Sequence, residues 1–221
     1  GEIDYLSNIL KPNLAIITNI GEAHLGNLGS IKNIAKAKAE IIKNITKQGT
    51  IILNQDCKFF DQLKKISKKN KIKVLSFGST SKATVSYKVI SINEIEIKLN
   101  NLKFKLKLNN INPNIINNIL VCILVLSFFK LNIKKSKNYF NKIKNTRGRG
   151  NIVKFRKKII IIDDSYNSNP SSLKSSINQF EKLYTKKKKI LVIGDMLELG
   201  KFSKKKHGEI GNYLSKMRFN R

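Results

Sequence analysis

The stretch Leu14-Ala15-Ile16-Ile17-Thr18-Asn19-Ile20-Gly21 decides the fold class of this chain. Its first five residues form a short apolar run rich in β-branched side chains, which is typical of a buried parallel strand. Small and polar residues follow at once, at the end of the strand where sheets of parallel strands bind ligands. The stretch therefore predicts an α/β protein with a site directly after this strand.

Outward from that stretch, apolar runs and amphipathic segments alternate, which favours α/β architecture. Residues 83–108 differ, because apolar and polar side chains alternate there with a period of two, as in an antiparallel meander with one solvated face. The other expected elements of this half are helices over 31–45, 59–68, 115–129 and 135–144 and strands over 50–53 and 72–77. The sequence thus predicts a parallel sheet plus a small antiparallel sheet.

The polar segment Asn145–Gly150 contains two glycines and is the candidate domain boundary. Beyond it a new series begins, with buried strands over 159–162 and 189–193 and helices over 171–183 and 202–217. We therefore expect two partial domains, 1–146 and 147–221. The chain also lacks an initiating Met and stops after a helix-like segment, so we expect a fragment of a longer protein.

The charge of the chain invites a nucleic-acid hypothesis. Its 221 residues carry 44 Lys plus Arg against 14 Asp plus Glu, a net charge of +30 and a pI near 10.2, and clustered cations neutralise phosphates. Only five of the cations are Arg, however, the lysines are scattered, and Asn and Ile are abundant too. This pattern favours a composition bias on a solvated surface. We expect no nucleic-acid partner and keep a basic nucleic-acid-binding module as the alternative from a different class.

The expected cellular compartment rests on the cysteines, the first residues and the longest apolar run. Cys57 and Cys122 have no metal-ligand spacing and cannot form a disulfide framework, which favours reduced packing residues. The first residues show no secretory signal, and the longest apolar run, 119–129, is too short to span a bilayer. We expect a cytoplasmic monomer without membrane insertion.

Two residues near the first strand are candidates for chemistry. His24 could ligate a metal or contact phosphate, or it could be satisfied by a nearby backbone group. Lys38 falls on the apolar stripe of the helix expected over 31–45, where an amine loses hydration and becomes partly neutral. Such a lysine is either functional or extends to the surface past small neighbours.

Two further segments follow expected strands. The run 163–170, Asp-Asp-Ser-Tyr-Asn-Ser-Asn-Pro, places two carboxylates at a strand end and leads into a helix N-terminus, where backbone N–H groups favour anions. Six polar residues in seven positions exceed what a simple turn with an N-cap requires. The run 194–200, Gly-Asp-Met-Leu-Glu-Leu-Gly, is either a second part of a site or a loop that uses glycine for its turn geometry.

At these four segments the chain resembles the Mur ligases, and most closely the branch that adds D-alanyl-D-alanine. The matching patterns are T-N-I-G-x-A-H-L at 18–25, I-A-x-A-K-x-E-I at 34–41, D-D-S-Y-N-x-N-P-x-S at 163–172 and G-D-M-L-E-L-G at 194–200. The resemblance implies the rest of a central ATPase domain followed by the first half of a Rossmann-like C-terminal domain. It also implies ATP-dependent and Mg²⁺-dependent amide-bond formation between UDP-N-acetylmuramoyl-tripeptide and D-alanyl-D-alanine, through an acyl phosphate, for peptidoglycan synthesis.

The resemblance carries roles onto single residues. Lys38 matches a lysine that is carbamylated and helps to hold Mg²⁺, and His24 matches a metal-site histidine. The remaining matches are Asn114 and Asn117 beside adenine, Arg149 and Asp164 toward ATP, and Asn167 and Asn169 as contacts to substrate or phosphate.

The chain also departs from the family pattern. It contains no G-x-x-x-x-G-K-[ST] phosphate loop, no N-terminal UDP-binding domain, no metal-binding Glu ahead of Gly1 and no end of the C-terminal domain. The family's G-x-H-N beside adenine appears as Ile111-Asn112-Pro113-Asn114. We therefore expect no ligase activity from these 221 residues alone. The nearest rival is another amide ligase of the same superfamily, of the Mur or folylpolyglutamate type.

Overall fold

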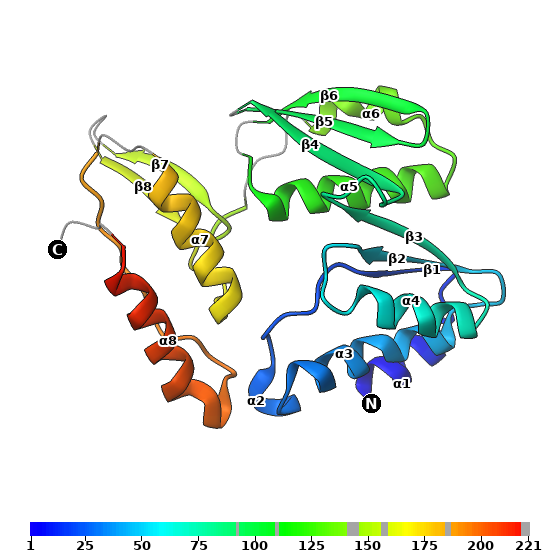
Figure 1. The fold of residues 1–221 in the computed structure, drawn as a ribbon, viewed down its shortest axis with the longest axis horizontal. Helices are drawn as coiled ribbons and strands as arrows, with labels where there is room; N and C mark the ends of the chain where they lie inside the picture. The colour runs from blue at the N-terminus through cyan, green and yellow to red at the C-terminus, as the bar shows by residue number, and fades with distance from the viewer. Residues whose placement is uncertain (92, 109–110, 141–145, 156–158, 184–186, 218–221) are drawn as a thin grey trace. The chain divides into compact units, whose positions relative to one another are not determined.

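The computed structural model describes residues 1–91, 93–108, 111–140, 146–155, 159–183 and 187–217. The chain forms two compact units (Figure 1). The first comprises Gly1–Ile20 and Ala35–Ile143, and the second comprises Gly21–Ile34 and Lys144–Arg221. The segment Gly21–Ile34 therefore belongs to the second unit although the chain on both sides of it belongs to the first.

The first unit is built on one mixed sheet with its six strands in chain order. The strands are β1 (Leu14–Ile17), β2 (Thr50–Asn54), β3 (Lys73–Gly78), β4 (Val85–Ser91), β5 (Glu94–Leu99) and β6 (Leu102–Lys107). β1 to β3 are parallel and β4 to β6 form the antiparallel meander. The two expected sheets are continuous, because β3 and β4 pair in parallel through Phe77–Val85 and Gly78–Ser86.

Helices cover this sheet, and most of them lie where the sequence predicts them (Figure 1). They are α3 (Ile31–Ala39), continued by the 3₁₀ helix η1 (Glu40–Asn44), α4 (Phe60–Lys69), α5 (Pro113–Phe128) and α6 (Ile133–Phe140). α4 packs on β2 and β3, and α5 packs on β3 and β4. The sixteen-residue α5 begins with Asn112, whose side chain accepts a hydrogen bond from Asn114 N–H, and with Pro113 in its first turn.

Alternation supplies the core of the meander, as the sequence predicts. Ile95, Ile97 and Leu99 of β5 are buried, while the residues between them are partly or fully exposed. On α5 the buried side chains recur at spacings of three and four, at Ile116, Ile119, Leu120, Ile123 and Leu124.

Helix α1 (Glu2–Leu10) is absent from the sequence-based expectation. Its packed side is polar, because Asn44 Nδ2 donates to Asp4 Oδ1 at 2.8 Å and to Ser7 Oγ at 2.9 Å. Its large apolar side chains, Tyr5, Leu6, Ile9 and Leu10, are exposed instead. Apolar periodicity therefore does not mark the face on which this helix packs.

The second unit contains the hairpin of β7 (Asn151–Phe155) and β8 (Ile159–Asp163), which pair antiparallel. Its helices are α2 (Leu25–Leu28), α7 (Pro170–Lys182) and α8 (Ser203–Ser215), with the 3₁₀ helix η2 (Gly200–Phe202) before α8. α7 and α8 confirm the helices expected over 171–183 and 202–217.

Two strand predictions in this unit are wrong in part or in full. The expected strand over 189–193 does not form, and Val192 in it is 91% exposed. β8 forms, but it is not buried, since Ile159 and Ile161 are about half exposed. A parallel strand is buried when strands flank it and helices cover both faces. β8 instead pairs with β7, which was not expected, and the 189–193 run pairs with neither strand.

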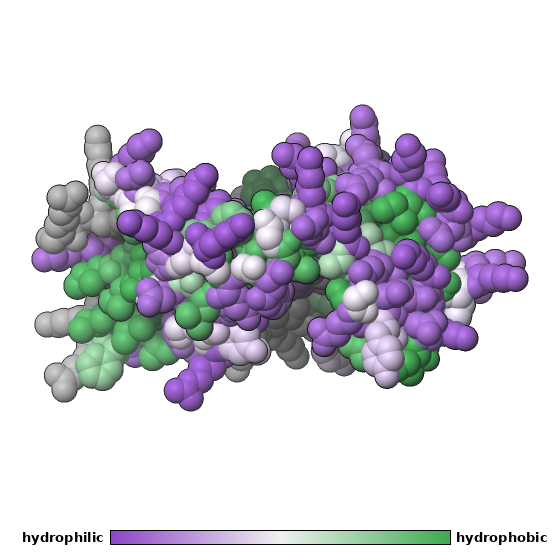
Figure 2. Space-filling view, turned by 90° about the horizontal axis from the view of Figure 1, so that it is seen from below, coloured by the Kyte–Doolittle hydropathy of each residue, from purple (hydrophilic) through white to green (hydrophobic). Residues whose placement is uncertain are grey.

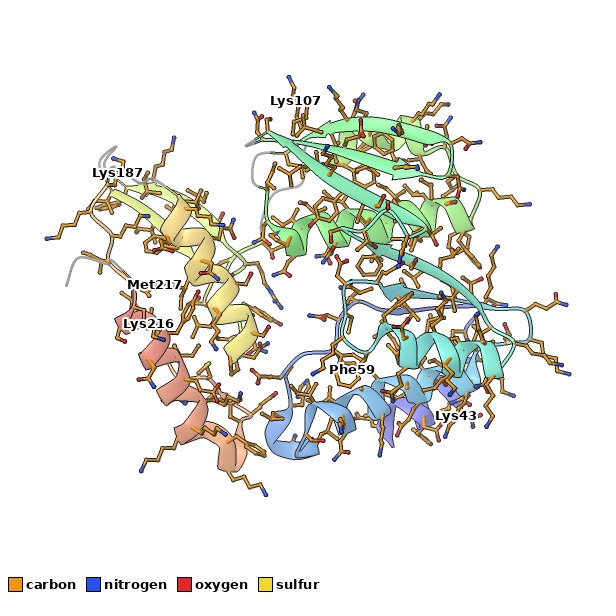
Figure 3. All side chains as sticks on the ribbon, viewed as in Figure 1. Lys43, Phe59, Lys107, Lys187, Lys216 and Met217 are labelled. Carbon is orange, nitrogen blue, oxygen red and sulfur yellow. The ribbon has the colours of Figure 1, made fainter. Side chains whose placement is uncertain are left out.

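The surface carries the excess of lysine. Figure 2 shows hydrophilic side chains over much of the visible face, with apolar patches among them. Figure 3 shows nitrogen-tipped side chains projecting from both units, among them Lys43, Lys107, Lys187 and Lys216. No helix in the described part of the chain is long and apolar enough to cross a membrane.

Candidate functional site

The carboxyl end of β1 borders a cavity of about 210 Å³ in the first unit. Ile17 and Ile41 contribute apolar walls, and Thr18, Asn19 and Lys38 contribute polar groups. Lys38 is half-buried, and its Nζ donates to the Asn19 carbonyl oxygen at 2.8 Å. The amine is thus directed at the strand end beside the cavity. This placement favours a functional lysine over one that extends to the surface past small neighbours.

Burial also changes the acid–base behaviour of Lys38. Loss of hydration lowers the pKa of its amine below the ordinary value of 10.5, and the electrostatic influence of Cys57 offsets part of that effect. A larger neutral fraction follows than for an exposed lysine. A neutral amine is the form that adds CO₂ to give a carbamate.

Side chains after β2 and β3 hold this sheet edge together. Asn54 Nδ2 donates to the Thr18 carbonyl oxygen at 3.2 Å, and Asn54 Oδ1 accepts from Asp56 N–H at 2.9 Å. Asp56 Oδ2 in turn accepts from Ser79 N–H at 2.7 Å. A Cβ on Gly78 would lie 2.8 Å from Asp56 Oδ1, so a larger residue there would displace the Asp56 carboxylate. The ends of β1, β2 and β3 are therefore cross-linked by hydrogen bonds.

Asn114 and Asn117 lie in the first two turns of α5, three residues apart and so on one face. Asn114 is exposed, and its backbone N–H is capped by Asn112. Asn117 Oδ1 is buried without a hydrogen-bond partner among the described residues. A buried acceptor without a partner is costly, and a donor such as an adenine amino group would satisfy it. Lys38 makes no hydrogen bond to either asparagine among the described residues.

In the second unit, the loop after β8 is tied to the turn before β7. Asp163 Oδ1 accepts from the Ser165 hydroxyl at 2.6 Å, and Asp163 Oδ2 accepts from Gly148 N–H at 3.2 Å. Tyr166 N–H donates to the Gly148 carbonyl at 3.0 Å. The hydrogen bonds to Asp163, from the Ser165 side chain first, lower the pKa of its carboxyl below the usual 3.8. Gly148 has φ of +73°, which favours glycine at the centre of this arrangement.

This loop positions Arg149 and Asp164 in one region of the second unit. The Arg149 guanidinium carbon lies 4.1 Å from the centroid of the Tyr166 ring, in a cation–π contact. Asp164 Oδ2 accepts a hydrogen bond from the Ser176 hydroxyl of α7. Both candidate nucleotide contacts are exposed, and the Arg149 guanidinium is accessible to an anionic ligand.

The N-terminus of α7 completes this region. Asn169 is its N-cap and accepts from Ser171 N–H and Ser172 N–H, while the Ser172 hydroxyl accepts from Asn169 N–H in a capping box. Asn169 thus has a structural task, whereas Asn167 is exposed. The Ser168 hydroxyl is buried with no hydrogen-bond partner among the described residues.

His24 lies elsewhere in the second unit, beside the 194–200 segment. Its Nδ1 is 2.7 Å from Glu198 Oε2. The sequence offered a metal, a phosphate or a backbone group as its partner and did not identify Glu198. A pair 174 positions apart leaves no local periodic signal, and only the acidic residue in Gly-Asp-Met-Leu-Glu-Leu-Gly could have suggested it.

The resemblance implies ATP and Mg²⁺ as ligands, and the described residues suit them to different extents. The unpartnered Asn117 oxygen and the exposed Arg149 are suited to a nucleobase and to phosphate. In the described ranges, no three His, Cys, Asp or Glu side chains converge as a metal centre. Mg²⁺ prefers oxygen ligands, which a carbamate on Lys38 would supply. The metal roles of Lys38 and His24 remain predictions, and the two residues belong to different units.

The fold and these loops match one class of enzyme. Residues 1–126 match the Mur ligase middle domain, and residues 148–219 match the domain described as Mur ligase, glutamate ligase domain. The chain therefore belongs to the Mur ligase family.

Within the family, relatives point to one branch. The chain is 34% identical over 219 residues to the UDP-N-acetylmuramoyl-tripeptide–D-alanyl-D-alanine ligase of Rickettsia prowazekii, covering 97% of this chain and 48% of that protein. MurF from Acinetobacter baumannii superposes with a TM-score of 0.89 at 25% identity over 99% of this chain and 48% of that one. MurF ligase from Thermotoga maritima, solved in complex with ADP, gives 0.84 at 27% identity over 98% and 50%. This chain thus spans about half the length of these relatives.

Proposed function

We propose that this chain is part of an ATP-dependent ligase that joins D-alanyl-D-alanine to UDP-N-acetylmuramoyl-tripeptide through an acyl-phosphate intermediate. The similarity to the Rickettsia enzyme of that name over 97% of the chain carries the proposal. The segment 163–172, one of the four that carry the resemblance, is held by hydrogen bonds from Gly148 N–H and within the segment itself, which supports its use as a recognition element.

In this proposal the first unit contributes Lys38 and the α5 asparagines. The half-buried Lys38 amine in its neutral form adds CO₂ and releases one proton to solvent, and the resulting carbamate offers two oxygens at the end of β1. Asn117 Oδ1 accepts a hydrogen bond from the adenine amino group, which relieves its unpartnered state. Asn114 supports this contact from the same face of the helix.

The second unit contributes cations and backbone dipoles. Arg149, supported by the Tyr166 ring, binds phosphate oxygens, and Asp164 lies on the adjoining loop to contact the nucleotide. Asn167 and the α7 N-terminus offer donors to substrate or phosphate. Mg²⁺ would neutralise charge on the phosphates during transfer.

An assay of the protein expressed from its complete reading frame tests this function. Phosphate release should require ATP, Mg²⁺, UDP-N-acetylmuramoyl-tripeptide and D-alanyl-D-alanine together, and the product should be the pentapeptide. Release that depends on glutamate or on a single amino acid instead would assign the chain to another amide ligase of the superfamily.

The 221 residues alone provide a second test. Because they contain no phosphate loop of the G-x-x-x-x-G-K-[ST] type, they should release no phosphate under the same conditions. Substrate-dependent turnover by this chain alone would show that the phosphate-binding elements of the reaction lie within it.

A further inference from the structure

The Arg149 side chain contacts the face of an aromatic ring. Its guanidinium carbon lies 4.1 Å from the centroid of the Tyr166 ring. Among the described residues, the guanidinium has no hydrogen-bond or ion-pair partner. A guanidinium is planar and carries its five N–H donors along its edges. A centroid distance of 4.1 Å fits a guanidinium stacked on the ring, an arrangement that leaves those edges uncovered.

The backbone around this contact is fixed by hydrogen bonds that involve neither of the two side chains. Tyr166 N–H donates to the Gly148 carbonyl oxygen at 3.0 Å, and Gly148 N–H donates to Asp163 Oδ2 at 3.2 Å. Arg149 N–H donates to the Thr146 carbonyl oxygen at 3.0 Å. Because Gly148 directly precedes Arg149, these bonds also set the separation between Arg149 and Tyr166.

The close approach of the two segments depends on Gly148. Its φ of +73° lies in the left-handed region, and a Cβ built on it would lie 3.0 Å from Tyr166 Cβ. The turn before β7 therefore touches the loop after β8. This contact brings the start of the Tyr166 side chain beside the residue that precedes Arg149.

The stability of the fold does not account for the position of the Tyr166 ring. The side chain is 68% exposed, so its ring adds little to a core. An exposed cation–π contact adds only a small increment to stability, and holding an arginine side chain in one conformation costs entropy. An exposed arginine that is nevertheless held against a ring is better explained by the orientation of its donors.

We propose that Tyr166 is a positioning residue for Arg149 and that its ring fixes the guanidinium plane, so that the N–H edges are presented to a phosphate group. Bidentate contact with phosphate needs two N–H groups in one plane, and a plane that is set in advance lowers the ordering cost of binding. The ring face supplies this orientation, and the phenolic hydroxyl is not required. The phosphate ligand rests on the proposed function, whereas the contact between the two side chains does not.

NMR of the ¹⁵N-arginine-labelled chain tests the contact. The chain has five arginines, and the Nε–H signal of Arg149 is the one that is lost in Arg149→Lys. A proton over the face of an aromatic ring is shielded, so this signal should lie upfield of its position in Tyr166→Leu. Tyr166→Phe retains the ring and should retain the upfield position. An Nε–H signal that does not move in Tyr166→Leu would overturn the proposal.

Controls separate the contact from the fold of the loop. Tyr5, on α1 in the first unit, is also 68% exposed, so Tyr5→Leu is the matched control and should leave the Arg149 signal unchanged. The Gly148 amide, which donates to Asp163, should keep its protection from hydrogen exchange in Tyr166→Leu. If that protection is lost, the loop itself has changed. The wild-type chain then decides, because a stacked pair must show nuclear Overhauser effects between the Arg149 side chain and the Tyr166 ring protons.

The complete protein tests the consequence for phosphate binding. Tyr166→Leu should raise the KM for ATP by about 2-fold to 5-fold, the size expected for one exposed cation–π contact, while kcat and the KM for D-alanyl-D-alanine stay unchanged. Tyr166→Phe should match the wild type. A KM for ATP that is unchanged in Tyr166→Leu, or raised equally in Tyr166→Phe, would refute the positioning role. Absence of ligase activity in the wild-type protein would instead refute the proposed function, and the NMR comparison would still decide whether the ring holds Arg149.

Discussion

Lys38 is the residue whose chemistry the fold alters most directly. Because burial lowers the pKa of its amine, Lys38 should form a carbamate more readily than the exposed lysines of the same helix. In ¹³C-bicarbonate, the NMR spectrum of the chain should show a carbamate carbon that is lost in Lys38→Arg. The signal should grow as the pH rises toward the lowered pKa. Lys36→Arg, at an exposed position on α3, is the control and should keep the signal. A carbamate that persists in Lys38→Arg would place the modification elsewhere.

Asp163 couples the order of its loop to pH. Its carboxyl has a lower pKa in the folded chain than its usual 3.8, so folding gains stability above that value and loses it as the pH falls through the folded-state pKa. Asp163→Asn should reduce the free energy of unfolding at neutral pH, and the difference should shrink in acid. Urea unfolding at both pH values measures this. Ser165→Ala, which removes the strongest donor to Asp163, should give a smaller loss over the same pH window. A loss that does not change with pH would show that packing, not charge, is responsible.

Among the elements, the strand predicted over 189–193 does not form in the structure. Val192 is 91% exposed, whereas Ile177 on α7 is 1% exposed. Val192→Ser should therefore change the free energy of unfolding by less than about 0.5 kcal/mol, and Ile177→Ala should reduce it by about 2–5 kcal/mol. Urea unfolding of both variants measures the contrast. A loss above about 1 kcal/mol for Val192→Ser would mean that this run packs as a strand.

The elements that the sequence predicts correctly are those whose signal is local. The apolar run Leu14–Thr18 and the period-two alternation over 83–108 each carry a local signal, and both form strands. The 189–193 run has the same composition as a buried strand, but burial depends on neighbours that local composition does not specify. Helix α1 escapes prediction because hydrogen bonds from Asn44 hold its polar face.

The same division holds for the candidate site. Lys38 is identifiable because it interrupts an apolar stripe, and the structure places it half-buried at the strand end. Glu198 is not identifiable in this way, because its partner His24 lies in a distant part of the sequence. The unpartnered oxygen of Asn117 is likewise a property of the packed fold. Sequence patterns therefore yield the residue types of the site, and tertiary structure supplies their partners.

At the scale of the whole molecule, the net charge of +30 raises the question of whether charge repulsion acts globally or pair by pair. Charged pairs on the exposed face of the meander distinguish global repulsion from repulsion between neighbouring pairs. Lys98 lies opposite Lys103 in the β5–β6 register, whereas Lys105 lies opposite Glu96. Like charges directly opposite destabilise a sheet, and opposite charges stabilise it by about 0.2–1 kcal/mol.

Lys98→Glu and Lys105→Glu lower the net charge equally, but they change their cross-strand pairs in opposite senses. If local pairing dominates, Lys98→Glu should raise the melting temperature and Lys105→Glu should lower it at low ionic strength. Both shifts should shrink in about 1 M NaCl, where the screening length falls to about 3 Å. Thermal unfolding at the two salt concentrations measures this, with Lys98→Gln and Lys105→Gln as neutral controls. We expect opposite signs, since these pairs face each other within a fixed register. If both charge reversals stabilised the chain to the same extent, long-range repulsion among its lysines would outweigh the register of the sheet.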